Sequence, residues 1–548
     1  MQKFSFKVFL FFYTILSIHA YSQQKISPKH PKLIIQVVVE QMRYDLIHRY
    51  WEKFSDKGFK KLIDQGAFCS NAFYDYMVTE SAPGFATIAT GANPSEHGIV
   101  SNNWYVRLSE KEQFCISDGK NTNSNLSDNN FSPKQIIGTT YSDELRMSNY
   151  KQSKAIGISL KNYAAILSSG TLANAAYWFD DKNGNWTSSP YYMDSVPLWV
   201  KQFNQKEFVQ QYLKREWNTI APVHTYKESL SDNNSYETGF SNKQKTFPYD
   251  LSKLSNLDGP QIIKYTPFGN TYTLDFSIAA IMNENLGKDQ YPDFISISFS
   301  TPGYVNERFG LHSVELEDIY LRLDNDIAHL LEFIDDYLGR ENVLVVLTSD
   351  RGASENPAFS KEIGIPVGKF NPDLAISLTE SYLKATYGQS GWIKHYSNGQ
   401  IYLNQYFLDI SKVPVADVQI KIAQFISQFK GVASTTTGSI LQSADSTSGI
   451  LQKFRNSYNQ IRSGDVFICL LPGWIEDRNS MGHDFVNQSS PYRYDSHVPL
   501  IFYGWKIAKT EISDPIPMNN LAPTIVKFLD ISYPTGANGK AIGGILVK

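Results

Sequence analysis

The sequence predicts an α/β fold, in which a doubly wound, mostly parallel sheet is interrupted by an inserted smaller lobe. Short β-branched runs recur along the chain, each followed by a polar turn and a helical pattern, and this order is typical of doubly wound sheets. The first run, at 32–39, lacks alternation between polar and apolar residues, as expected for a strand buried on both faces. Between about 362 and 462 an amphipathic helix and a stretch rich in Ser, Thr and Gly indicate the inserted lobe.

The elements follow in order from the positions of apolar runs and turn residues. Strands are expected at 32–39, 155–160, 294–299, 343–347, 466–471 and 498–503. Helices are expected at about 45–54, 58–66, 81–91, 274–286, 314–338, 415–429 and 520–529.

Length and composition restrict the class of protein. The chain has 548 residues, of which 42% are hydrophobic and 19% charged, so it is long enough to form a globular protein with more than one lobe. Its net charge of −3 and the absence of a basic patch with interleaved aromatic residues argue against a nucleic-acid partner. The three cysteines allow at most one disulfide within the chain, and buried free thiols are the preferred interpretation.

The N-terminus has the pattern of an export signal. Lys3 and Lys7 precede an apolar run at 8–18, and small residues follow at Ala20 and Ser22. That run is too short to span a membrane, and no later segment approaches about eighteen apolar residues, so we expect a periplasmic or extracellular protein without a membrane span. The predicted organisation is a signal peptide at 1–22, the first part of the α/β domain at 31–361, the inserted lobe at 362–462 and the closing part at 463–548.

Two stretches carry the first candidate site residues. In the stretch 79–91, Ser81 lies where an N-cap is expected, Pro83 suits a first helical turn, and Gly91 can end the helix. A serine there lies beside unpaired backbone N–H groups, so Ser81 is a candidate phosphate-facing nucleophile, with an ordinary capping role as the alternative. Glu40 follows the first strand, at the end where open α/β sheets bind ligands.

Many further motifs occur in one order along the chain, and together they resemble the alkaline phosphatase superfamily, most closely its PafA-like phosphate-irrepressible branch. The motifs are Val-Val-Glu-Gln-Met-Arg-Tyr-Asp at 38–45, Thr-Gly at 90–91, His-Gly-Ile at 97–99, Asn-Asn-Trp at 102–104, Gly-Ile-Ser-Leu-Lys at 157–161, Thr-Pro-Phe-Gly-Asn at 266–270, Leu-Arg-Leu-Asp at 321–324, Thr-Ser-Asp at 348–350, Tyr-Asp-Ser-His-Val-Pro at 494–499 and Leu-Ala-Pro-Thr-Ile at 521–525.

The resemblance implies phosphate-monoester hydrolysis by two zinc ions and a threonine or serine nucleophile at the carboxyl ends of the sheet. At the first implied zinc site, the family's aspartate corresponds to Glu40, its nucleophilic threonine to Ser81, and its Asp-His pair to Asp350 and Arg351. Arginine stays protonated and has no lone pair for a metal. We therefore hypothesise that Arg351 replaces the lost cation by pairing with Glu40, Asp350 or both.

The second implied zinc site is altered as well. The family's Asp-Tyr-Val-Gly-His turn corresponds to residues 303–307, so that Glu307 stands in place of the histidine. The last histidine ligand corresponds to Gln488, and nearby His483 would substitute only if the turn is rerouted. Of the residues that contact phosphate in the family, Asn102 and Lys161 are retained, whereas an arginine is lost.

Two functions follow from this comparison of motifs. In the first, the chain is an exported phosphatase-like protein that lacks efficient two-zinc catalysis and binds a phosphate-bearing small molecule or another anion. In the second, it is an active phosphomonoesterase that uses Ser81 and a rearranged metal site. Glu40, Ser81 and Asp350 would then supply oxygen ligands to one hard divalent cation such as Mg²⁺. The cofactor is accordingly zinc in the family, and here either no metal or one divalent cation.

Overall fold

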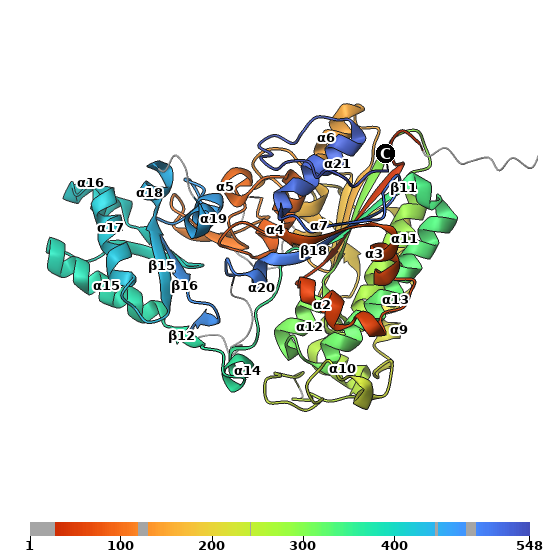
Figure 1. Ribbon diagram of the computed structural model, residues 1–548, viewed down its shortest axis with the longest axis horizontal. Coiled ribbons are helices and arrows are strands. Elements are labelled where there is room, and N and C mark those ends of the chain that lie inside the picture. The colour runs from red at the N-terminus through yellow and green to blue at the C-terminus, as the bar shows by residue number, and fades with distance from the viewer. Residues whose placement is uncertain (1–27, 119–129, 242, 444–447, 478–488, 548) are drawn as a thin grey trace, which may run out of the picture.

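A ten-stranded sheet forms the centre of the larger part of the molecule, which is described here from a computed structural model (Figure 1). The structure describes residues 28–118, 130–241, 243–443, 448–477 and 489–547. The predicted signal peptide lies outside these residues. Strand order is β19-β2-β18-β11-β1-β10-β5-β6-β7, with β20 pairing beside β2.

The central strands of this sheet are parallel. Strand β1 pairs in parallel with β10 and β11, and β5 pairs in parallel with β10 and β6, whereas β18 is antiparallel to β11 and β2. The prediction of a mostly parallel sheet is therefore confirmed. The strand bounds are β1 Leu33–Val39, β2 Ala67–Phe73, β5 Ala155–Ser159, β6 Ala175–Phe179, β7 Trp186–Thr187, β10 Asp293–Phe299, β11 Val343–Thr348, β18 His497–Gly504, β19 Thr510–Ile512 and β20 Ile516–Pro517.

Helices cover both faces of the sheet, as expected for a doubly wound fold. Alternate residues of β1 enter two different cores, with Ile35 and Val37 in one and Ile34 and Val38 in the other. The first core is covered by α2 Tyr44–Arg49, α3 Phe59–Gln65, α11 Pro267–Asn283, α12 Thr301–Phe309 and α13 Val314–Tyr337. The second is covered by α4 Ser81–Thr90, α6 Tyr141–Ser148, α7 Asn162–Ser169 and α21 Leu521–Leu529.

Two helices differ from what the sequence analysis expected. Helix α11 starts at Pro267, seven residues before the predicted position 274, and α12 occupies residues that the family resemblance describes as a turn. Both have proline in the first helical turn, where its missing N–H costs nothing. The proline marked a helix start in each case.

The inserted lobe is built on its own sheet and extends to one side of the molecule (Figure 1). Its strand order is β13-β14-β16-β15, and helices α15 and α17 pack against this sheet. The bounds are β13 Ile393–Ser397, β14 Gln400–Leu403, β15 Val432–Thr437, β16 Val466–Leu470, α15 Pro372–Tyr387, α16 Gln405–Ser411 and α17 Val415–Ile426. We placed strand β16 in the closing part of the α/β domain, but it pairs here with β14 and β15. A short apolar run predicts a strand without indicating which sheet that strand joins.

Smaller elements complete the described chain. They include β3 Asn103–Val106, β4 Lys111–Phe114, α5 Pro94–His97, α8 Leu198–Asn204, α9 Phe208–Tyr212, β8 Glu216–Trp217, β9 Tyr249–Asp250, α10 Leu251–Asp258, α14 Pro357–Glu362, β12 Gly368–Phe370, α18 Gly438–Ser443, α19 Gly449–Ser457, β17 Trp474–Glu476 and α20 Arg493–Ser496. All three cysteines are buried free thiols, as preferred above. Within the described ranges, no helix has the length and apolar character needed to cross a membrane.

Helix α4 packs directly against the turn after β11, because residue 84 has no side chain. A Cβ atom at Gly84 would lie 1.9 Å from the backbone oxygen of Asp350. Such a contact is far too short, so either the helix or the turn would have to move.

We predict that Gly84→Ala destabilises the fold. Alanine normally favours a helix by about 1 kcal/mol over glycine, but overpacking against backbone should reverse the sign and cost about 1–3 kcal/mol. Chemical denaturation measures the difference. Gly543→Ala, at a glycine with no neighbouring atoms within 4 Å, is the control and should be nearly neutral. A stabilised Gly84→Ala variant would contradict the packing argument.

Candidate active site

The candidate site residues converge at the carboxyl ends of the central strands. Glu40 follows β1, Lys161 lies between β5 and α7, and Asp350 follows β11. Since β5, β10, β1 and β11 are parallel neighbours, their carboxyl ends lie at one edge of the sheet, where open α/β sheets bind ligands. The N-terminus of α4 reaches the same edge, because Gly84 contacts Asp350.

Glu40 is fully buried and forms an ion pair with Lys161. Its Oε2 atom lies 2.7 Å from Lys161 Nζ, and its Oε1 atom accepts hydrogen bonds from Ser300 Oγ at 2.5 Å and Ser298 Oγ at 3.2 Å. Both carboxylate oxygens are thus engaged. The two serines come from β10 and the residue after it, so the end of one strand orients the acid at the end of its neighbour.

Lys161 is 9% exposed and lies over the ring of Tyr304, with Nζ 4.4 Å from the ring centroid. Burial, the largest single influence, would lower the pKa of Lys161, but Glu40 together with Tyr163, Glu307 and Tyr304 outweighs it and leaves the pKa well above its ordinary value. The side chain is therefore a permanent cation at this edge of the sheet.

A strained turn after β1 binds the carboxylate of Asp350. Gln41 has a φ of 58°, a left-handed conformation that is costly for a residue other than glycine. In this conformation its N–H donates to Asp350 Oδ1 at 2.8 Å, and the next N–H, of Met42, donates to Ser349 Oγ at 2.9 Å. The turn after β1 is thus joined to the end of β11 by hydrogen bonds from backbone N–H groups to side-chain oxygens. The sequence analysis did not identify Gln41 as a site residue, although its place directly after Glu40 was a usable signal.

Asp350 is buried and electrostatically linked to the other site groups. Burial raises its pKa to about 6, Glu40 adds to the rise, and Arg351 and the Ser81 hydroxyl oppose it. Its Oδ2 atom accepts no well-formed hydrogen bond from the described residues. This oxygen is therefore available to a ligand or a cation.

Ser81 is the first residue of α4, and Glu80 occupies the N-cap position that we expected for Ser81. The N-terminus is capped from outside, because Asn102 Oδ1 accepts a hydrogen bond from the N–H of Ala82 at 2.9 Å. Asn102 is held in turn by Glu80, whose Oε2 accepts from the Asn102 N–H at 2.5 Å. The Ser81 hydroxyl is therefore not needed as a cap, and it faces Asp350.

Glu307 is held by the same turn. It accepts a hydrogen bond at 2.8 Å from Gln41 Nε2, and Gln41 Oε1 accepts from Asn306 Nδ2 at 2.8 Å. Glu307 and Asn306 lie on α12, which begins beside the end of β10. Glutamine 41 thus links this helix to the end of β1.

Arg351 is buried next to Asp350, with 3% of its surface exposed. Its charge lowers the pKa of both Asp350 and Asp495 relative to burial alone. The ion pair that Glu40 makes in the structure is with Lys161, rather than with Arg351 as one version of our hypothesis required. Gln488 and His483, the remaining candidate ligands, lie outside the described residues.

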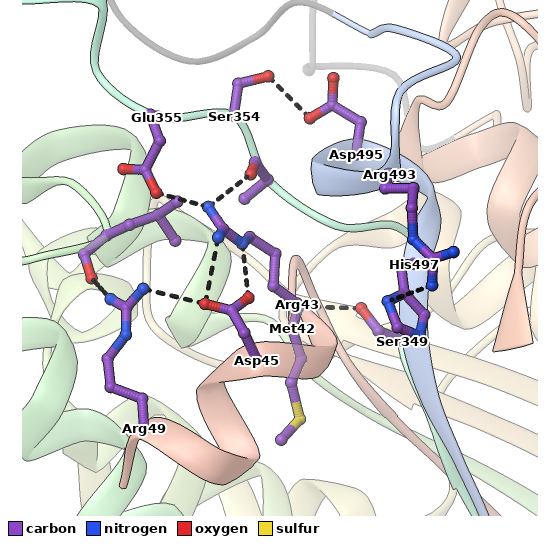
Figure 2. Close-up of polar contacts among 12 residues, drawn as sticks. Met42, Arg43, Asp45, Arg49, Ser349, Ser354, Glu355, Arg493, Asp495 and His497 are labelled. Atoms are coloured by element: carbon purple, nitrogen blue, oxygen red, sulfur yellow. Dashed lines mark hydrogen bonds and ion pairs between the residues drawn. The ribbon is translucent and has the colours of Figure 1, made fainter. Parts of the chain in front are cut away.

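A second polar cluster surrounds Arg43 (Figure 2). Arg43 lies between two acids, with Nε 2.7 Å from Asp45 Oδ1 and Nη1 2.7 Å from Glu355 Oε1. Glu355 also contacts His312 at 3.0 Å. Burial acts to raise the pKa of Glu355, but His312 and Arg43 lower it to about 2. The carboxylate therefore stays ionised and joins the loop after β11 to the loops after β1 and α12.

The fit of the described residues to zinc can be tested from their chemistry. Zinc requires a tight set of about four imidazole, thiolate or carboxylate donors. Among the residues described here, no group of three or more His, Cys, Asp or Glu side chains could hold a metal ion. Glu40 is engaged by Lys161 and Glu307 by Gln41. Within the described ranges these donors do not fit a two-zinc centre, and the oxygens of Asp350 and Ser81, joined by Glu40 only if Lys161 left it, would suit one hard cation.

His97, on the short helix after α4, is part of the core. It is fully buried in α5, its Nδ1 accepts from the N–H of Ile99 at 3.1 Å, and its Nε2 lies 3.1 Å from Thr87 Oγ1. Because Nδ1 accepts, Nε2 carries the proton and the ring is neutral. Burial, with a contribution from Arg462, lowers the pKa of His97 to about 3.

The fold and the convergence of an acid, a lysine and a helix N-terminus define a phosphoester-hydrolase-like protein of the α/β class. A family model for type I phosphodiesterase / nucleotide pyrophosphatase matches residues 34–489. The chain is similar to alkaline phosphatase PafA of Elizabethkingia meningoseptica, with 36% identity over 94% of each chain. It is also similar to a protein of Myroides odoratus named calcium-transporting ATPase, with 35% identity over 93% of this chain and 94% of the relative.

The crystal structure of wild-type PafA superposes with a TM-score of 0.88 at 35% identity, covering 94% of this chain and 99% of that one. The chain therefore belongs to the type I phosphodiesterase / nucleotide pyrophosphatase family and, within the alkaline phosphatase superfamily, to the PafA-like branch.

We predict that Lys161→Met destabilises the fold by about 3–5 kcal/mol, because it leaves the charge of Glu40 buried without a counterion. The double variant Glu40→Gln/Lys161→Met should recover most of this loss, since it buries no charge. Chemical denaturation of both variants measures the two changes. The exposed pair of Lys253 and Asp250, 3.0 Å apart, supplies the control, and Lys253→Met should leave stability nearly unchanged. Equal effects of Lys161→Met and Lys253→Met would refute the assignment.

We also predict an acid-sensitive contribution from His97. In the unfolded chain this histidine takes up a proton near its ordinary pKa of 6.5, whereas in the folded protein it does so only near 3. Stability should therefore be complete above pH 6.5 and fall by about 1.4 kcal/mol per pH unit as pH decreases below it. Denaturation between pH 7 and 4, compared with His97→Gln, measures the slope. The slope should persist in the control variant His224→Gln, and a slope unchanged by His97→Gln would contradict the prediction.

Proposed function

We propose that this protein is an exported alkaline-phosphatase-like protein whose site binds a phosphate-bearing small molecule or another anion and no longer performs efficient two-zinc hydrolysis. The ion pair between Glu40 and Lys161 is the observation that carries the proposal. It places an ammonium group against the first strand-end acid of the site, to which the family resemblance assigns a zinc ion. The adjacent Arg351 supplies a second cation that cannot ligate metal.

The groups that remain suit anion binding. Lys161 and the N-terminus of α4 supply positive charge and N–H donors, the combination that binds phosphate groups at helix N-termini. Asn102 orients that N-terminus. Alkaline phosphatase relatives are the basis for expecting a phosphate-bearing ligand. The predicted signal at 1–22 is the basis for expecting export to the periplasm or beyond the cell.

The second candidate function is an active phosphomonoesterase with an altered site. It is favoured by one observation: Ser81 lies beside Asp350, and Asp350 Oδ2 has no well-formed hydrogen bond from the described residues. One hard cation bound by these oxygens and Glu40 would supply Lewis-acid chemistry. Ser81 would then be the nucleophile, and Lys161 would have to leave Glu40.

Metal analysis and turnover by the purified mature protein separate the two functions. We expect well under one equivalent of metal per chain, and p-nitrophenyl phosphate turnover that stays at background with added zinc, magnesium or calcium and does not change in Ser81→Ala. We also expect inorganic phosphate to raise the melting temperature of the wild type, and to do so less in Lys161→Met. Stoichiometric zinc, or turnover abolished by Ser81→Ala, would overturn the first function and establish the second.

A further inference from the structure

Two buried glutamates, Glu237 and Glu315, form a pair that the proposed function does not use. Glu315 lies in the first turn of α13 and Glu237 in the loop at 230–240, and their exposed fractions are 0% and 2%. The Oε2 atom of each is buried and has no hydrogen-bond partner among the described residues. The charge of Glu237 acts on Glu315, so the two carboxyl groups share one buried environment.

The other oxygen of each glutamate is held by a neutral donor. The hydroxyl of Tyr249 donates to Glu315 Oε1, and Asn234 Nδ2 donates to Glu237 Oε1 at 2.5 Å. Burial raises the pKa of Tyr249, so this phenol stays protonated and uncharged. These two contacts orient the carboxyl groups without neutralising them.

The charged groups around the pair do not balance it either. Asp232, in the same loop, adds negative charge to both glutamates, and its Oδ1 atom is also buried without a hydrogen-bond partner among the described residues. Lys245 acts on Glu237 in the opposite direction, but more weakly than Asp232. Arg308, at the end of α12, donates instead to the backbone oxygen of Gly239 at 2.9 Å. Within the described ranges neither glutamate forms an ion pair.

A buried pair of carboxyl groups without a counterion is stable only when a proton or a metal ion neutralises it. Burial raises the pKa of Glu237 to about 8, with Asn234 and Lys245 opposing the rise. Burial and Glu237 raise the pKa of Glu315 well above its ordinary value. A metal ion needs more donors, and within the described ranges no group of three or more His, Cys, Asp or Glu side chains could hold one. A proton needs only two oxygens.

The loop that carries Glu237 links the helix of the candidate site to the segment before the inserted lobe. The N–H of Thr238 donates to the backbone oxygen of Arg308 at 2.9 Å, on the helix α12 that also carries site residues. On the other side, the backbone oxygen of Tyr236 accepts a hydrogen bond at 3.2 Å from Asn356, the N-cap residue of α14. A change in this loop would therefore reach both α12 and α14.

We propose that Glu237 and Glu315 share one proton, held between their Oε2 atoms, and that this proton keeps the loop 230–240 closed against α12 and α13 and makes its opening dependent on pH. The protonated carboxyl donates to the ionised one. When the loop opens, both glutamates enter water, where their ordinary pKa is 4.5, and the shared proton passes to water.

The sign of the pH dependence follows from this proton. Between pH 4.5 and about 8 the closed form binds one proton more than the open form. A rise in pH therefore favours opening, by about tenfold per pH unit for one proton. Above that range both forms are ionised at this pair and the dependence ends. The inference concerns a proton on the chain itself and does not rest on the proposed function.

Hydrogen exchange followed by mass spectrometry between pH 5.5 and 7.5 measures the opening in the purified mature protein. The amides of Leu230 and Thr238 report it, because in the closed form they donate to the backbone oxygens of His312 and Arg308. After correction for the intrinsic pH dependence of amide exchange, the opening constant should rise about tenfold per pH unit. Residues 33–39 of β1, measured in the same samples, report global unfolding and should exchange far more slowly at each pH.

Glutamine variants test the shared proton directly. In Glu237→Gln the amide donates a permanent hydrogen bond to Glu315 and has no proton to release, so the opening constant should become independent of pH. Glu315→Gln should behave in the same way, because either carboxyl can be the protonated partner. Glu216→Gln, at an exposed residue of β8, is the control and should keep the tenfold slope. Melting temperatures of all variants establish that they fold.

Three results would overturn the inference. The first is an opening constant of the wild type that does not change with pH, and the second is a tenfold slope retained in both glutamine variants of the pair. The third is calcium at millimolar concentration, the range of extracellular sites, slowing exchange of the loop in the wild type but not in Glu237→Gln. A metal ion would then occupy the place that we assign to the proton. A slope in the wild type and the control variant that both variants of the pair lose would support the inference.

Discussion

The buried ion pair between Glu40 and Lys161 is the interaction on which the geometry of the site depends. It joins the end of β1 to the junction of β5 and α7 across the intervening strand β10, whose end supplies the two serine donors to the same carboxylate. An isolated buried charge raises the free energy of the folded state by far more than hydrogen bonds lower it. Each partner is therefore tolerated only because the other is present, and the relative positions of these strand ends are constrained.

A second constraint acts through the backbone. The left-handed conformation at Gln41 turns two successive N–H groups toward the end of β11, while the Gln41 side chain contacts α12. Strain of about 1–3 kcal/mol persists only where surrounding contacts determine the conformation, and here the contacts come from β11 and α12. The cluster around Arg43 then fixes the loops farther from the sheet (Figure 2). The ion pair of Glu40 and the backbone conformation of Gln41 thus both constrain the positions of these strand ends.

The sequence was sufficient to predict the sheet, and it offered Glu40 as a candidate site residue because this residue follows a short apolar strand. Lys161 and Asp350 became candidates through the family resemblance, and they lie near the ends of neighbouring strands. The sequence was not sufficient to predict which of these charged residues pair. Arg351 and Lys161 are both cations at this edge of the sheet, and which one reaches Glu40 depends on how α7 packs beside β5, a tertiary property. The sequence also did not reveal that β16 belongs to the smaller sheet. Strand pairing depends on partners that are distant along the chain.

A cation that belongs to the chain differs chemically from a bound metal ion. An ammonium group can neutralise Glu40 and attract an oxyanion, but it has no empty orbital to accept the Ser81 oxygen, so it cannot lower the pKa of that hydroxyl as a metal does. The N-terminus of α4 contributes only about half an elementary charge. On our proposal the site therefore keeps the positive charge that attracts an oxyanion. It lacks a metal ion that would lower the pKa of the Ser81 hydroxyl. Binding without efficient turnover is then a direct consequence of the Glu40–Lys161 pair.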